Sequence, residues 1–127
     1  MKKFVAICAL MLAGVPVAAE ELNSGDVFYC ESNVFAVSGS ETDWKLKQYR
    51  DQKFKIKVTD EVVSFTSDGW FDGLRIGVAF FVGTRLEAKS MGESLAFTLT
   101  GGNKATFVYS HVGFHGFVSI TADCDRF

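Results

Sequence analysis

Apolar and polar residues alternate along several stretches of the chain, and this pattern restricts the fold more than any other feature. Phe54, Ile56 and Val58, for example, alternate with three lysines. Such a period of two is typical of β-strands with one buried face, because successive side chains point to opposite sides. The clearest stretches are 53–58, 95–100, 105–110 and 118–124. Further strands are expected over 27–37, 44–49, 62–66 and 74–81.

Turn residues separate these stretches, and Gly101-Gly102 between two alternating runs is the strongest hairpin signal. The segment 84–91 is ambiguous. Thr84 and Glu87 fit a helix capping box, but Leu86 and Ala88 also fit one face of a strand. A strand is favoured there because strands are expected on both sides. About eight short strands predict an all-β fold, a small antiparallel barrel or sandwich.

The first 19 residues have the features of a cleavable signal peptide. Lys2 and Lys3 precede an apolar run, and small residues at Val17 and Ala19 suit signal peptidase. We therefore expect residues 1–19 to be removed and 20–127 to form a single β domain, periplasmic or secreted, without a membrane span. Loss of the two lysines would change the net charge from −2 to −4. Nucleic acid is not an expected partner of such an acidic chain.

Cys30 and Cys124 are the two cysteines of this expected mature segment. An even pair in an oxidising compartment predicts a disulfide, which would bring the first and last strands together. Terminal strands that meet favour a barrel over a sandwich. Two cysteines without further paired ligands have no recognised zinc spacing, so no metal is expected.

Catalytic motifs are not found, and neither an enzyme nor a cofactor is predicted. His111 and His115 are the only histidines, and they flank what looks like a hairpin tip. We interpret them as exposed turn residues, with a general base as the alternative reading.

A lysine-rich stretch is the first candidate binding surface. Period-two spacing places Lys45 and Lys47 on one face of a strand. The same spacing places Lys53, Lys55 and Lys57 on one face of the next strand. If these two strands form a hairpin, both sets share a face that would suit an anionic partner. The alternative is a solvated face whose lysines prevent edge-to-edge aggregation.

Two aromatic residues in the loop 67–73 form the second candidate. Trp70 and Phe71 stand among aspartates and glycines, where exposure of large apolar rings is costly. They could anchor a partner, or they could fold back and plug one end of the barrel. The plug is the favoured interpretation.

These features predict a small non-catalytic binding protein that acts through a surface patch, with inhibition of an envelope enzyme as one form of that activity. Its expected partner is a protein or an anionic envelope glycan. The alternative is a lipocalin-like carrier of a small apolar ligand, and an enzyme comes third. Small periplasmic β-barrel lysozyme inhibitors have a similar plan. Their serine-glycine-arginine-tyrosine type of signature is absent, because Ser38-Gly39 is followed by Ser40 and Glu41, so no family is assigned.

Overall fold

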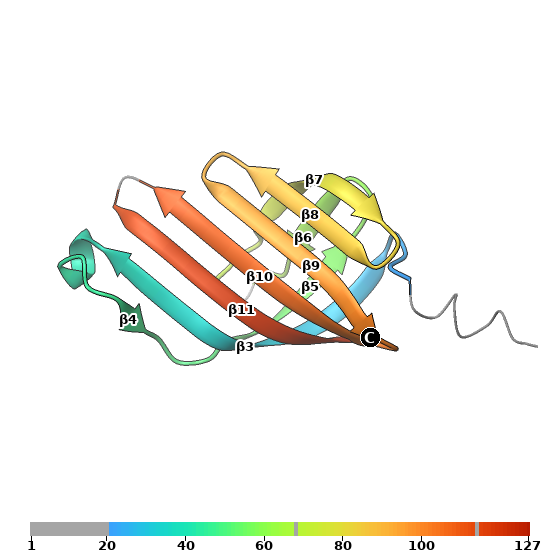
Figure 1. Cartoon of the computed structure of the whole chain (residues 1–127), viewed down its shortest axis with the longest axis horizontal. Helices are drawn as coiled ribbons and strands as arrows, with labels where there is room; N and C mark the ends of the chain where they lie inside the picture. Colours follow the sequence, from blue (N-terminus) through green and yellow to red (C-terminus); the bar gives the residue numbers. More distant parts are fainter. Residues whose placement is uncertain (1–20, 68, 114) are drawn as a thin grey trace, which may run out of the picture.

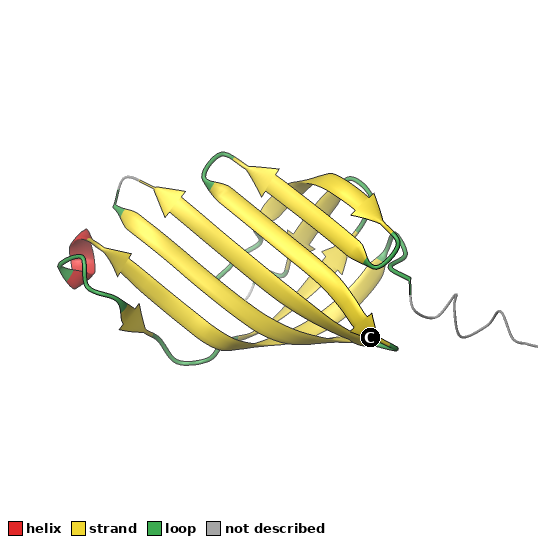
Figure 2. Cartoon of the chain, viewed as in Figure 1, coloured by secondary structure: helices red, strands yellow, loops and turns green. Residues whose placement is uncertain are grey.

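The computed structural model describes residues 21–67, 69–113 and 115–127, and the expected signal peptide at 1–19 lies outside these residues. Nine strands follow one another in the described part of the chain, with one turn of 3₁₀ helix, η1, after the first (Figures 1 and 2). The elements are β3 (Asp26–Gly39), η1 (Ser40–Thr42), β4 (Lys47–Gln48), β5 (Lys53–Val58), β6 (Val62–Phe65), β7 (Arg75–Val82), β8 (Arg85–Ser90), β9 (Glu93–Gly101), β10 (Lys104–Gly113) and β11 (Gly116–Arg126). The strand predicted over 84–91 is confirmed as β8. Among the described residues, no helix has the length and apolar character that a membrane crossing requires.

Eight of the strands close into an antiparallel barrel (Figure 1). Each strand from β5 to β11 pairs with the next in sequence, β3 pairs with β5, and β11 returns to pair with β3. The predicted all-β antiparallel fold is confirmed, and of the two architectures considered the structure is the barrel. Closure leaves the main-chain groups of the terminal strands paired with each other instead of exposed at an edge.

The closing seam carries the disulfide. In the register of β3 and β11, Cys30 lies directly opposite Cys124, and the two residues form the predicted bond. Both side chains point inward and are buried. The covalent link therefore ties the first barrel strand to the last.

Aromatic rings fill the barrel interior. The side chains of Phe54, Phe65 and Phe107 are buried and contact one another at centroid distances of 5.0 to 6.1 Å. Large flat side chains fill a small barrel with few residues, which explains the 13 phenylalanines of the sequence.

A β-bulge at Asn33 changes which side chains of β3 face inward. Opposite β11, Ala122 pairs with Ser32 and Thr121 pairs with Val34, so Asn33 has no counterpart. Because one extra residue shifts the alternation, the inward side chains are even-numbered before the bulge and odd-numbered after it. Phe28 and Cys30 accordingly face the core on one side of Asn33, and Phe35 does so on the other.

The long strand β3 accommodates two partners on the edge that faces away from β11. Its first half, Asp26–Glu31, pairs with β5, while Ala36 and Val37 pair with β4. The hairpin considered for the two lysine strands does not form, because β4 and β5 lie one after the other along β3. The strand expected over 44–49 shrinks to Lys47–Gln48.

The backbone explains why that strand starts late. Asp43 and Trp44 have φ values of 57° and 60°, in the left-handed region that interrupts an extended chain. The amide of Trp44 donates to the carbonyl of Gly39 (2.8 Å), and Thr42 Oγ1 accepts a hydrogen bond from the Gly39 amide (3.0 Å). These bonds hold a compact turn where the sequence pattern predicts a strand.

Candidate functional site

The barrel wall is hollowed on its outer side. One hollow of about 630 Å³ lies over β3 and its two neighbours, β5 and β11. A second hollow of about 390 Å³ shares Tyr29, Lys55 and Thr66 with the first and extends along β5 and β6. We refer to the two together as the outer groove. Its outward side chains include Tyr29, Glu31, Asn33, Lys53, Lys55, Lys57, Thr66, Asp123, Asp125 and Phe127.

The bulge on β3 accounts for the position of the groove. The side-chain amide of Asn33 donates to Asp123 Oδ2 (3.1 Å), and Asn33 Oδ1 accepts a hydrogen bond from the Thr121 hydroxyl. On the other edge, the backbone amide of Gln52 donates to Ser32 Oγ (2.7 Å) where the chain passes from β4 to β5. Bulges are common beside binding sites because they bend a strand and redirect side chains. Here the bulge bends β3 where its neighbour changes.

A row of lysines forms one side of the groove. Lys53, Lys55 and Lys57 are directly opposite Glu31, Tyr29 and Val27 of β3, respectively. Alternation places the three ammonium groups on the outer face at intervals of about 7 Å along β5. None of the three forms an ion pair with a residue of the described structure. Lys55 Nζ lies 5.6 Å from the centre of the Tyr29 ring.

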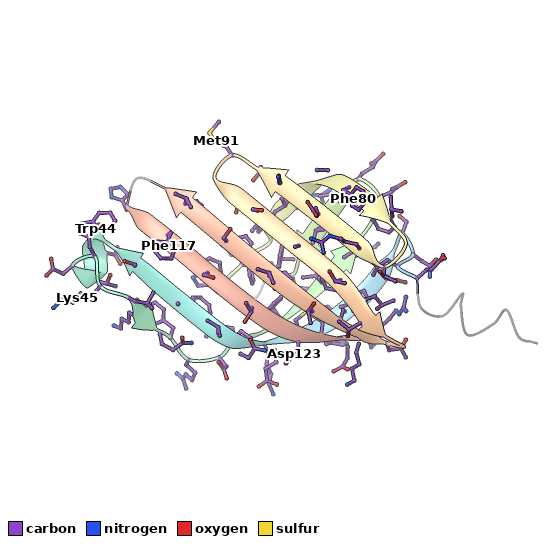
Figure 3. The ribbon with its side chains drawn as sticks, viewed as in Figure 1. Trp44, Lys45, Phe80, Met91, Phe117 and Asp123 are labelled. Atoms are coloured by element: carbon purple, nitrogen blue, oxygen red, sulfur yellow. A yellow bond between two sulfur atoms is a disulfide. The ribbon has the colours of Figure 1, made fainter. Side chains whose placement is uncertain are left out.

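A row of carboxylates forms the opposite side. On β11, Asp123 lies opposite Glu31 and Asp125 lies opposite Tyr29, and Asp123 projects outward from the wall (Figure 3). Asp125 forms an exposed ion pair with Lys104, whose pKa is raised by this hydrogen bond and by the carboxylate charge. Glu31 faces Lys53 on one side and Asp123 on the other, but it forms no ion pair within the described residues.

The floor between the two rows is aromatic. Tyr29 is 46% exposed and Phe127 is 82% exposed. Their rings meet edge to face at a centroid distance of 5.1 Å. An exposed pair of rings between two rows of charge offers a partner both apolar contact and electrostatic selection.

Lys45 and Lys47 do not belong to the lysine row of the outer groove. Lys47 is opposite Val37, which packs against the core, so it extends from the inner face of the sheet. Its Nζ atom lies 5.2 Å from the centre of the Tyr49 ring. Lys45 lies beside Trp44 at the end of the barrel (Figure 3). The predicted common face of the five lysines is therefore wrong, because the bulge at Asn33 inverts the alternation between the two halves of β3.

Trp70 and Phe71 do not line the outer groove. Phe71 is buried, and its ring stacks on Phe65 at a centroid distance of 4.1 Å. This position matches the plug interpretation and removes Phe71 from any exposed surface. Trp70 remains 43% exposed and packs edge to face on Phe71 and on Phe35. It covers the plug and can still contact a partner.

The histidines form no metal centre with described residues, since no group of three His, Cys, Asp or Glu side chains converges in that part of the chain. His111 lies opposite Glu93 in the pairing of β10 with β9. Glu93 itself accepts a hydrogen bond from the buried Tyr109 hydroxyl (2.7 Å). Burial, together with this bond, raises the pKa of Tyr109, so Tyr109 keeps its proton as a structural donor.

Several groove residues were not predicted as site residues from the sequence. Tyr29, Glu31 and Asp123 belong to segments predicted as strands, and alternation identifies them as outward-facing, whereas Asp125 follows directly after the predicted strand 118–124. No local sequence pattern predicts that β5 and β11 are the two neighbours of β3. The disulfide was the available signal, because pairing Cys30 with Cys124 places Glu31 beside Asp123.

Together, the fold and the groove define a class: a small disulfide-closed antiparallel β-barrel with a charged, aromatic-floored groove on its outer wall. Comparisons with protein-family models, curated proteins and solved structures gave no significant match.

Proposed function

We propose that this is a non-catalytic binding protein of the periplasm or the extracellular space, and that it holds an envelope partner in the outer groove. The observation that carries the proposal is the lysine row. Lys53, Lys55 and Lys57 border a hollow without forming an ion pair to any described residue. Lysine side chains without an ion-pair partner along one side of a hollow attract the acidic groups of a partner. Inhibition of an envelope enzyme is one form that such binding can take.

Rigidity supports the same proposal. The groove residues stand on paired strands, and the Cys30–Cys124 bond lies directly beneath them. A preorganised surface loses little conformational entropy when a partner binds, so more of the contact energy becomes affinity. The proposed partner is a protein or an anionic envelope glycan.

The carrier alternative receives no specific support. The rings of Phe54, Phe65, Phe71 and Phe107 contact one another inside the barrel. An apolar ligand in the interior would have to displace these side chains. The two hollows described above are both open to solvent and lie on the outer wall.

The test is capture of partners from an envelope extract of the host by the immobilised, oxidised 20–127 segment. The triple variant Lys53→Gln/Lys55→Gln/Lys57→Gln should lose the captured material, and capture by the wild type should weaken as salt increases. Lys45→Gln/Lys47→Gln/Lys89→Gln is the matched control, because it removes the same number of exposed charges outside the groove. If both variants capture as much as the wild type, the assignment of the groove is refuted. If both lose capture to the same extent, the partner is attracted by overall charge alone.

A further inference from the structure

The outer groove presents both signs of charge in separate rows. Lys53 and Lys55 belong to β5, Asp123 and Asp125 belong to β11, and β3 lies between these strands. Adjacent strands are about 4.8 Å apart, so the two rows are separated by about 10 Å. Glu31 and Lys53 are direct neighbours across strands, and neither forms an ion pair with another residue that the structure describes. Both charges therefore remain available to a ligand.

This arrangement does not suit a purely anionic polymer. An extended polyanion aligned with Lys53 and Lys55 would lie beside Glu31 and Asp123, and like charges at this range repel. Asn33 fixes Asp123 by a hydrogen bond of 3.1 Å, so the carboxylate is held at the groove instead of turning away. The acidic row thus selects against ligands that carry negative charge only.

We infer, resting on the proposed function, that the partner is a polypeptide segment with acidic and basic side chains on either side of an apolar residue. Its acidic groups pair with the lysine row, and its basic groups pair with Glu31 and Asp123. The apolar residue packs on the rings of Tyr29 and Phe127, which are exposed between the two rows. A polypeptide satisfies this pattern more readily than a glycan, because its side chains supply both charge signs and apolar groups within about 10 Å of one another.

The probe is a displayed library of random dodecapeptides, selected on the immobilised, oxidised wild-type protein and depleted on Lys53→Gln/Lys55→Gln. Enriched peptides should contain both acidic and basic residues together with an aromatic or aliphatic one. The best peptide is then synthesised, and its Kd is measured by fluorescence anisotropy. Enrichment of acidic peptides only, or of none, would overturn the inference.

The sign of two substitution effects gives the sharper test. Both Lys53→Gln/Lys55→Gln and Glu31→Gln/Asp123→Asn should weaken binding of that peptide, each by about threefold or more, in line with exposed charge pairs. Glu41→Gln/Glu87→Gln is the matched control, because it removes two acidic charges outside the groove and should leave Kd unchanged. Far-UV circular dichroism and thiol titration confirm that each variant is folded and oxidised.

The envelope-capture experiment separates failure of this inference from failure of the proposed function. If the acidic substitutions strengthen capture while the lysine substitutions abolish it, the groove binds a polyanion such as a glycan and the inference is wrong. If neither pair changes capture or peptide affinity, the groove is not the binding site and the proposed function fails as well.

Discussion

Breaking the disulfide between Cys30 and Cys124 should destabilise the barrel strongly. The bond joins residues 94 positions apart, so it closes a loop that includes most of the described chain. In the native state the two residues are already opposite each other in the β3–β11 pairing. The cross-link therefore acts mainly on the unfolded chain, whose entropy it reduces.

The size of this destabilisation follows from the length of the loop that the disulfide closes. A closed loop of about 95 residues gives a chain-entropy stabilisation of about 4.7 kcal/mol at 25 °C. Domains of this size unfold with a total free energy of about 5–15 kcal/mol, so the bond supplies a third or more of the stability. At about 4–8 °C per kcal/mol, the loss corresponds to a decrease in Tm of about 20 °C or more.

Urea unfolding monitored by tryptophan fluorescence measures this loss. Three forms are compared: the oxidised protein, the reduced protein and Cys30→Ala/Cys124→Ala, which removes both buried sulfur atoms. The reduced form isolates the effect of the cross-link, because it keeps both sulfur atoms and loses only the bond between them. The m-value should rise in both uncross-linked forms, since their unfolded chains expand and expose more surface.

A loss below about 1 kcal/mol with an unchanged m-value would refute this reasoning. It would mean that the unfolded chain keeps β3 near β11 without the bond, so the cross-link removes little entropy. A large loss in the double alanine variant but not in the reduced protein would assign the effect to lost packing of the sulfur atoms instead.

Three further predictions concern the core and the end of the barrel. Phe71→Ala should lower the free energy of unfolding by about 3–5 kcal/mol in urea titrations, because its buried ring packs against Phe65 and other core rings. Folded Tyr109 has a pKa raised by burial and by its bond to Glu93, so it stays protonated where unfolded Tyr109, with a pKa of about 10, ionises. Its stabilising effect is therefore fully present below pH 10 and is lost as the pH rises further; urea titrations from pH 8 to 11 should show this decline, and Tyr109→Phe should reduce it. Gly39→Ala should lower Tm in thermal unfolding and disturb the turn after β3, because a Cβ atom there would lie 2.1 Å from the His115 carbonyl oxygen; an unchanged Tm would show that the chain relaxes at no cost.

The sequence alone determined most of the strands and the meeting of the first strand with the last. Alternation identified the strands because a half-buried strand must place apolar side chains at every second position. For 84–91 alternation left helix and strand open, and the strand that was favoured from its neighbours is β8, where Leu86 and Ala88 are buried and strands pair on both sides. The two cysteines predicted that the first and last strands meet, as they do at Cys30 and Cys124.

Only the tertiary structure decided which charges share a surface. Alternation assigned Lys47 and Lys53 to a common face, but the single extra residue at Asn33 inverts the alternation of β3 and places them on opposite faces. The pairing of β3 with both β5 and β11 also brought Glu31, Asp123 and the lysine row to one groove. A period of two records which residues of a strand point the same way, but a one-residue bulge and the identity of neighbouring strands depend on long-range pairing that no local pattern encodes.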